Sequence, residues 1–134
     1  MATILAHVKV KPGKEQQWED LARRLFADTH AKETAVRRYE YWRGADERTY
    51  YVLLSFDDYR GFLVHQSADH HEAEVGPIRD AVEAMRLEWV DPVEGASPLA
   101  PTDMQSAPDD ASDLAKQYAE THPADVQAWW LALR

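Results

Sequence analysis

Apolar and polar residues alternate at the start of the chain, from Thr3 to Val10, which is the period-two pattern of a β-strand. Residues 11–14 contain a Pro-Gly pair and predict a turn. From Lys14 to about Lys32 the apolar residues recur at steps of three and four, which predicts an amphipathic surface helix. The apolar face of this helix would consist of Trp18, Leu21, Ala22, Leu25 and Phe26.

Two aromatic-rich alternations follow, and they predict a β-hairpin. Residues 36–43 and 49–56 are strand-like, and the polar residues 44–48 supply the loop. The second strand is bulky on both faces, because Tyr50, Val52, Leu54 and Phe56 alternate with Tyr51 and Leu53. Such a strand needs a cover on both sides. Since a small domain usually has helices on one side of its sheet only, we expect a second subunit to cover the other side.

Two more helices and a strand complete this part of the chain. Asp57 is a good N-cap for a helix through residue 66 with a buried side of Tyr59, Phe62 and Leu63. Ser67 can cap a further helix, whose apolar residues recur as far as residue 85. Residues 86–90 are typical of a last strand. The order β-α-β-β-α-β predicts an α+β fold of the ferredoxin-like type.

The composition changes near residue 92, where four prolines within 17 residues are typical of a linker. We therefore expect a body over residues 1–94, a linker over 95–108 and a helical C-terminal segment over 109–134. In this segment Asp110 or Ser112 can cap a helix through Thr121, and the chain restarts a helix at His122-Pro123. Its end is rich in tryptophan and leucine, which predicts docking on the body or on a partner subunit, or a recruitment peptide for another protein.

Charge and composition exclude several classes of function. The chain of 134 residues carries 24 acidic against 15 basic residues, a net charge of −9, so we expect no nucleic-acid partner and no membrane surface. It has no cysteine, which excludes disulfides, a thiolate nucleophile and Cys-ligated metals. The N-terminus has neither a basic region nor a long apolar run, so we expect a cytoplasmic protein.

Residues 2–93 resemble the antibiotic biosynthesis monooxygenase (ABM) superfamily of dimeric α+β barrels. The resemblance is carried by the strand and turn from Ile4 to Gly13, the strand Arg37 to Glu40, the passage Tyr51 to Tyr59, and Phe62 to His65 followed by His70. It implies a homodimer in which each substrate pocket lies between a sheet and its own helices. The superfamily includes cofactor-free oxygenases of anthrones, quinols and other phenolics, and also haem-degrading enzymes.

The chain departs from this superfamily at several positions. Many members have Glu and Trp where this chain has Leu54 and Phe56, so any role of that carboxylate is absent here. The haem-degrading branch uses an Asn, a Trp and a His at positions that correspond to Ala6, His65 and Val75. The resemblance therefore disfavours haem degradation.

Three of the six histidines are candidate catalytic residues. His65 lies to one side of the apolar face of its predicted helix, which places it at the rim of a pocket at best. His70 would lie near the start of the next helix, where the helix dipole favours a neutral imidazole that can act as a general base. His71 falls on the apolar stripe with Val75 and Ile78, where a polar group is informative. The alternative is that all three are capping or hydrogen-bonded structural residues.

Aromatic side chains are the candidate substrate contacts: Tyr41, Trp42, Tyr51 and Phe62. The sequence does not fix which face of the second strand looks inward, so Tyr41 and Trp42 are alternatives, and such residues also serve as core or dimer contacts. We expect no metal site, because the histidines and carboxylates of residues 65–74 lack the H-E-x-x-H spacing and point in different directions.

The leading hypothesis is a cofactor-independent monooxygenase of a small aromatic, quinol or polyketide-type substrate. His70 or His71 would remove a phenolic or benzylic proton, and the electron-rich anion would react with O₂. The chain has no flavin, nicotinamide or haem motif, so no cofactor is expected. The alternatives are a non-catalytic dimeric module that binds a small molecule or a partner protein, and isomerase or decarboxylase chemistry, which needs no O₂.

Overall fold

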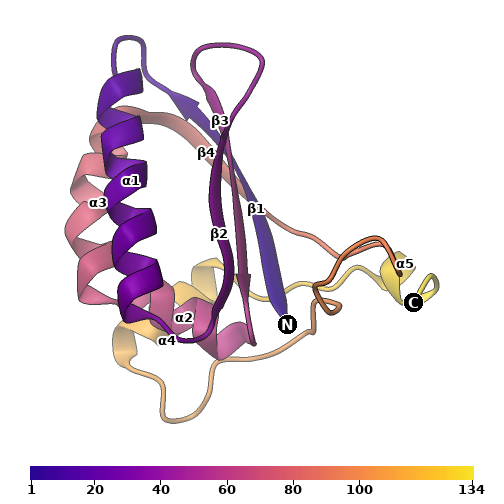
Figure 1. The fold of residues 1–134 in the computed structure, drawn as a ribbon. Coiled ribbons are helices and arrows are strands. Elements are labelled where there is room, and N and C mark those ends of the chain that lie inside the picture. The colour runs from indigo at the N-terminus through magenta and orange to yellow at the C-terminus, as the bar shows by residue number, and fades with distance from the viewer.

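The computed structural model describes residues 1–134, and its body is a four-stranded antiparallel sheet with helices on one face (Figure 1). The elements in chain order are β1 (Ala2–Val10), α1 (Glu15–Lys32), β2 (Val36–Arg43), β3 (Thr49–Phe56), α2 (Tyr59–Ser67), α3 (Asp69–Ala81), β4 (Val82–Trp89), α4 (Asp113–Thr121) and α5 (Ala128–Leu131). Helices α1 and α3 lie side by side along the sheet, and α2 lies at its end next to α4 (Figure 1).

The strand order in the sheet is β2-β3-β1-β4, and all neighbouring strands are antiparallel. Strand β1 is therefore internal, with β3 on one side and β4 on the other. This is the ferredoxin-like arrangement that the order of the elements predicts, so the α+β fold class is confirmed.

The alternation along β1 decides which side chains meet the helices. Its buried face consists of Ile4, Ala6, Val8 and Val10. The facing side of α1 consists of Trp18, Leu21, Ala22 and Leu25, all buried as the helical spacing predicts. Phe26, which we expect on the same face, is 44% exposed because it lies at the edge of the stripe.

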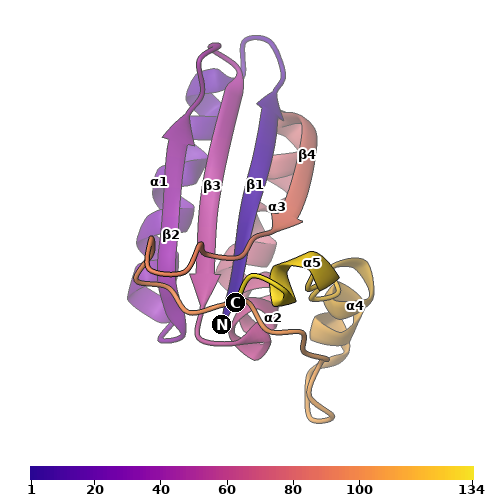
Figure 2. The ribbon, with the colours of Figure 1, turned by 90° about the vertical axis from the view of Figure 1, so that its right-hand side faces the viewer.

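The opposite face of the sheet carries none of the helices α1 to α4, and the segment after β4 and α5 lie only at its lower end (Figure 2). Leu5 and Leu53 face each other there across β1 and β3, and His7 faces Tyr51. These side chains are only partly buried, and Trp42, which pairs with Tyr51, is 59% exposed. Strand β3 thus presents bulky residues on both faces of the sheet, and the helices of the same chain cover only one of these faces.

The predicted boundary between the last helix of the body and its last strand is wrong. The apolar spacing predicts a helix as far as Met85 and a strand from Arg86, but α3 ends at Ala81 and β4 begins at Val82. Residues from Val82 onward pair with β1, with Val10 opposite Val82. A run of alternating apolar residues fits either period, and pairing with β1 decides in favour of the strand.

Two predicted helix caps are also wrong. Asp58 rather than Asp57 caps α2, because its carboxylate accepts a hydrogen bond from the Gly61 amide at 2.8 Å. Ser67 does not cap α3, because its hydroxyl donates to the Leu63 carbonyl at 2.8 Å. Helix α3 consequently begins at Asp69 without a side-chain cap.

Residues 109–134, which we call the C-terminal segment, pack on the body through α4 and through the residues that follow it. Ser112 caps α4 as predicted, with its hydroxyl accepting from the Ala115 amide at 3.1 Å. The predicted helix from His122 onward is wrong, because residues 123–127 are irregular and α5 is a single turn. No helix of the chain combines the length and the apolar composition that a membrane crossing requires.

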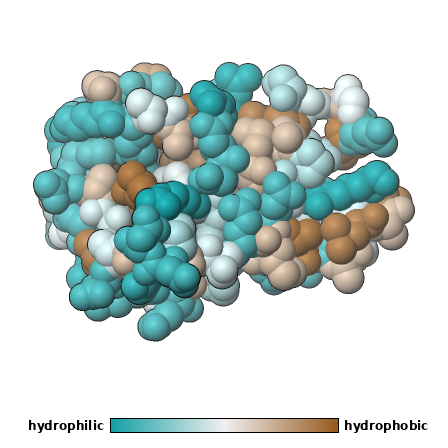
Figure 3. Space-filling view, turned by 90° about the horizontal axis from the view of Figure 1, so that it is seen from below, coloured by the Kyte–Doolittle hydropathy of each residue, from teal (hydrophilic) through white to brown (hydrophobic).

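Only one of the two neighbouring tryptophans docks. Trp130 is 8% exposed, whereas Trp129 is 65% exposed. The guanidinium of Arg134 donates two hydrogen bonds to Asp91, at 3.0 and 2.6 Å, and thereby ties the end of the chain to the residues after β4. Exposed apolar side chains gather at this end of the molecule (Figure 3), and they are Val93, Trp129, Leu131 and Leu133.

Candidate functional site

A cavity of about 320 Å³ lies between the sheet and the helices. This volume is at the lower end of the range for small-molecule pockets. Most of its lining is apolar, and it comes from all four strands and from α1, α2 and α3, for example Ala6, Val52 and Ile78. The polar or aromatic lining residues are Trp18, Tyr39, Tyr41, Phe62, His65, Gln66, His71, Arg79, Tyr118 and His122. Among the predicted site residues, Tyr41, Phe62, His65 and His71 line this cavity.

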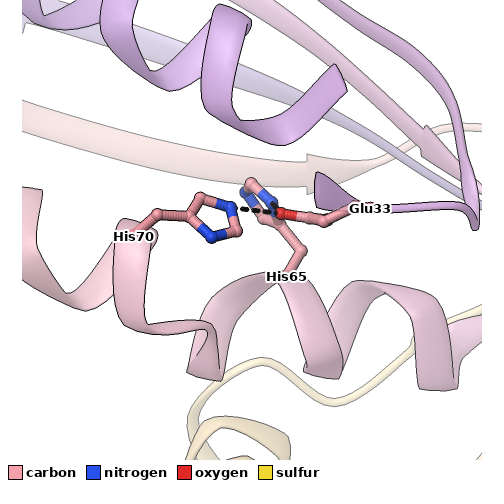
Figure 4. Close-up of side chains that lie close together, drawn as sticks. All are labelled: Glu33, His65 and His70. Atoms are coloured by element: carbon pink, nitrogen blue, oxygen red, sulfur yellow. Dashed lines mark hydrogen bonds and ion pairs between the residues drawn. The ribbon is translucent and has the colours of Figure 1, made fainter. Parts of the chain in front are cut away.

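Two of the predicted catalytic histidines share one buried carboxylate (Figure 4). The Nδ1 atom of His65 lies 2.9 Å from Oε1 of Glu33, and the Nε2 atom of His70 lies 2.7 Å from the same oxygen. Glu33 follows the end of α1, His65 belongs to α2 and His70 to the first turn of α3. All three side chains are at least nine-tenths buried, so the group is shielded from solvent.

Glu33 is ionised in this arrangement. Burial alone raises the pKa of its carboxyl, but the hydrogen bonds and charges of His65 and His70 outweigh burial and leave the pKa below its ordinary value. An ionised carboxylate only accepts hydrogen bonds, so His65 donates from Nδ1 and His70 from Nε2. In neutral His65 the other ring nitrogen, Nε2, is then a free acceptor, and this side chain lines the cavity.

The expectation that His65 lies at a pocket rim is wrong, because its side chain is 1% exposed. Helix α2 buries more than one narrow stripe, since it packs against α3 and α4 as well as the sheet. The rings of Tyr39 and Phe56 pack on His65 at centroid distances of 5.0 and 5.3 Å. These contacts, together with Glu33, fix the orientation of the imidazole.

His71 is a second histidine of the cavity wall, and it is neutral. Its ring centroid lies 4.8 Å from that of His65, and its Nδ1 atom is buried without a hydrogen-bond partner. Burial, and then the neighbouring His65, lower the pKa of His71 to about 4. This nitrogen is available to a ligand that enters the cavity.

Two tyrosines and one tryptophan also line the cavity, and only the tryptophan has an unpartnered donor. Tyr41 donates its hydroxyl proton to the Tyr39 hydroxyl at 2.7 Å. Burial raises the pKa of both tyrosines above the ordinary value, so both are protonated at neutral pH. The indole Nε1 of Trp18 is buried without a partner, and Trp18 lines the cavity. An unpartnered N–H of this kind can stabilise negative charge on a ligand.

Three predicted site residues do not line the cavity. Trp42 and Tyr51 lie opposite each other on the face of the sheet that carries no helix, because the strand period places Tyr41 and Val52 on the helix side. Of the two alternatives on β2, the inward residue is therefore Tyr41. His70 is absent from the lining and contacts the same oxygen of Glu33 as His65 does.

Glu33 is the residue that the sequence does not reveal. It lies in a charged stretch at the end of α1, which is typical of a solvated helix end. Its position beside α2 and α3 results from contacts 32 and 37 residues away in sequence. No local pattern in the sequence marks it.

One group of side chains could hold a metal ion. The ligand atoms of Glu33, His65 and His70 lie within 4.8 Å of one another. Two histidines and one carboxylate are a donor set that divalent transition metals accept. A bound metal would replace both hydrogen bonds to Oε1 of Glu33, since the same atoms make them. These hydrogen bonds satisfy the three atoms without an ion.

Comparisons with known proteins agree on the fold. The family model described as "Antibiotic biosynthesis monooxygenase" matches residues 1–75. A Caulobacter crescentus CB15 protein, described as a candidate antibiotic biosynthesis monooxygenase, is 25% identical, with a TM-score of 0.65 over 69% of this chain and 90% of its own. Rv0793 from Mycobacterium tuberculosis is 14% identical, with a TM-score of 0.65 over 72% of this chain and 98% of its own.

PA3566 from Pseudomonas aeruginosa is 18% identical, with a TM-score of 0.62 over 66% of this chain and 90% of its own. No curated protein matches the sequence. At these identities PA3566 and Rv0793 support the fold alone, whereas the family model covers more than half of the chain.

Proposed function

The chain belongs to the antibiotic biosynthesis monooxygenase family, and from this premise we propose that it is a cofactor-independent monooxygenase of a small planar aromatic, quinol or polyketide-type substrate. The observation that carries the proposal is the pair of Glu33 and His65 at the wall of an apolar cavity. A carboxylate that accepts from one imidazole nitrogen leaves the other nitrogen as a base. We expect the substrate to bind beside this nitrogen.

His65 takes the place of His70 and His71 as the proposed general base. His70 contacts the same carboxylate but does not line the cavity. His71 lines it, but burial lowers its pKa to about 4, so it is a weaker base near neutral pH. When His65 accepts a proton at Nε2, the charge of Glu33 stabilises the resulting imidazolium.

The proposed reaction converts a benzylic or anthrone-type methylene to a carbonyl. His65 removes one proton, and the carbanion adds to O₂ to give a peroxide anion, which takes up a proton. Loss of water from this hydroperoxide breaks the O–O bond and leaves the carbonyl, so the substrate loses two hydrogens and gains one oxygen atom. The unpartnered Nε1–H of Trp18 is the proposed donor to the negative charge.

The apolar lining serves this chemistry in two ways. It leaves a carbanion in a low-dielectric site, where fixed donors act more strongly than in water. It also excludes water, which would otherwise compete with the substrate for hydrogen bonds to the unpartnered nitrogens of Trp18 and His71. The tyrosines Tyr39 and Tyr41 remain protonated and bonded to each other, so they shape the wall without taking the substrate proton.

Oxygen uptake with anthrone and with hydroquinone tests this proposal. We expect the unaltered chain to consume O₂ above background, His65→Ala to lower the rate at least about 100-fold, and Glu33→Gln to lower it less. The exposed His30 at the end of α1 provides a matched control, since His30→Ala should retain full activity. Absence of uptake by the unaltered chain, or an unchanged rate in His65→Ala, would refute the proposal.

Two further outcomes separate the alternatives. Turnover under strict exclusion of O₂ would indicate isomerase or decarboxylase chemistry. A ligand that raises the thermal stability of the protein without being converted would indicate a non-catalytic binding module.

We further propose that the chain forms a homodimer through the face of the sheet that carries no helix. Leu5, Tyr51 and Leu53 are only partly buried on this face, and Trp42 is exposed. Ion-pairing residues flank them, including Glu88, which accepts from His7 at 2.9 Å. An apolar centre with a charged rim is typical of a subunit interface. Light scattering after size exclusion measures the expected dimer mass.

A further inference from the structure

The C-terminal segment contributes two side chains to the cavity, Tyr118 of α4 and His122 just after it. We propose that this segment is a fixed wall of the substrate cavity and that Tyr118 and His122 determine which planar ligands it admits. The inference rests on the proposed function, because it concerns the substrate range of that same cavity. It adds two specificity-determining residues from outside the part of the chain that the family model matches.

Four contacts fix the segment to the body. The Tyr59 hydroxyl donates to the His122 carbonyl at 2.8 Å, and the indole of Trp89 donates to the Pro123 carbonyl at 2.7 Å. Arg60 holds Asp110 by a two-point ion pair, at 3.2 and 2.9 Å. Two small residues of the segment, Ala115 and Ala124, are buried in the same core as the sheet. The wall is thus anchored on both sides of Tyr118.

Tyr118 offers its ring to a ligand rather than its hydroxyl. The hydroxyl donates a short hydrogen bond to the carboxylate of Glu72 on α3. Burial, and then this bond to Glu72, raise the pKa of Tyr118 to about 12, so the phenol is protonated near neutral pH. The ring lines the cavity, where a planar aromatic ligand can pack on it. The size of this side chain therefore affects the room that the cavity leaves for such a ligand.

His122 offers one nitrogen. Its Nδ1 lies 2.8 Å from the Thr121 hydroxyl, and its ring lies 6.2 Å from that of Phe62, almost edge-on. The remaining nitrogen, Nε2, makes no hydrogen bond within the chain, and the residue lines the cavity. This places an acceptor or donor for a ligand hydroxyl next to the aromatic wall.

The family model and two of the solved structures compared above match only part of this chain. The family model ends at residue 75, whereas α4 begins at Asp113. The match to Rv0793 uses 98% of that chain but only 72% of this one, and the match to the Caulobacter protein uses 90% and 69%. The two residues of the proposed wall thus lie outside the residues that the family model matches.

Calorimetric binding of two planar probes to the full chain tests the inference. The probes are 2-naphthol, with two rings, and anthraquinone-2-sulfonate, with three. We expect Tyr118→Ala to shift the ratio of the two Kd values about fivefold in favour of the larger probe, and Tyr118→Trp to shift it the opposite way. Gln117→Ala, on the exposed side of α4, is the matched control and should leave the ratio unchanged.

A second variant tests His122. His122→Phe keeps a ring beside Phe62 but removes Nε2, so we expect it to weaken 2-naphthol about fivefold relative to 2-methoxynaphthalene, which lacks the hydroxyl proton. A purely structural role would change the melting temperature of these variants without changing either ratio.

Ratios that stay within twofold in both folded Tyr118 variants would overturn the inference, and so would failure of the unaltered chain to bind either planar probe. If Tyr118→Ala does not fold, Tyr118→Leu tests the same enlargement. Binding that responds to Tyr118 without any O₂ uptake would refute the monooxygenase and leave the wall in place.

Discussion

Neutral His71 makes the stability of the protein depend on pH in a defined window. Its ordinary pKa is 6.5, and burial followed by the neighbouring His65 lowers the pKa in the folded chain to about 4. Between pH 6.5 and about pH 4, His71 is protonated in the unfolded chain and neutral in the folded chain. The stabilising contribution is therefore fully present above pH 6.5 and is lost as the pH falls toward 4.

The whole effect is about 3 kcal/mol, at about 1.4 kcal/mol for each pH unit between 6.5 and 4. Two thirds of this, about 2 kcal/mol, is lost by pH 5. The experiment stops at pH 5 because Glu33, whose pKa is lowered from 4.5, adds a loss of the same sign at lower pH. His71 faces His65 and His70, which oppose its protonation, and Glu33, which favours it.

Urea unfolding at pH 7.0, 6.0 and 5.0 measures this dependence for the unaltered chain, for His71→Gln and for His30→Gln. Glutamine does not titrate, so His71→Gln should lose about 2 kcal/mol less than the unaltered chain between pH 7 and 5, whatever its stability at pH 7. The exposed His30 should give the profile of the unaltered chain. Parallel profiles for all three proteins would refute the assignment of a buried neutral His71.

Three other measurements probe the remaining features. Glu33→Gln leaves His65 and His70 without their shared carboxylate and should lower the free energy of unfolding by about 3 kcal/mol in urea titrations, whereas Glu47→Gln in the exposed hairpin loop should change it by less than about 0.5 kcal/mol. Leu53→Asp should convert the proposed dimer to a monomer in light scattering, and a dimer that persists would exclude this face as the interface. Trp130→Ala should increase amide hydrogen exchange over residues 128–134, whereas Trp129→Ala, at 65% exposure, should leave it unchanged; equal effects would contradict the docking of one tryptophan.

The fold follows from the sequence wherever one period dominates over many residues. Strand β1 alternates without interruption, and α1 keeps its apolar spacing through five positions, so both elements are predictable. The stretch around Val82 and Met85 satisfies both the helical and the strand period. Its conformation is decided by pairing with β1, a partner more than 70 residues away, and no local pattern contains that information.

The residues of the candidate site likewise fall into those that a local pattern predicts and those that depend on distant contacts. Phe62 and His71 lie on helix faces that local periodicity identifies, and both line the cavity. Tyr41 and Trp42 could be separated only once the register of β2 on β3 was known. Glu33 has no local pattern at all, because a carboxylate at a helix end is normally solvated, and only packing of α2 and α3 over this residue buries it.

The position of the cavity wall at the end of the chain has an evolutionary consequence. The groups proposed for chemistry, Glu33 and His65, lie within the residues that the family model matches, whereas Tyr118 and His122 lie outside them. Mutation or replacement of residues 109–134 can thus change the ligand range while the reacting groups stay in place. Grafting this stretch onto a shorter family member would transfer a wall together with its selectivity, provided that the acceptor retains the anchors that Tyr59 of α2 and Trp89 of β4 supply here.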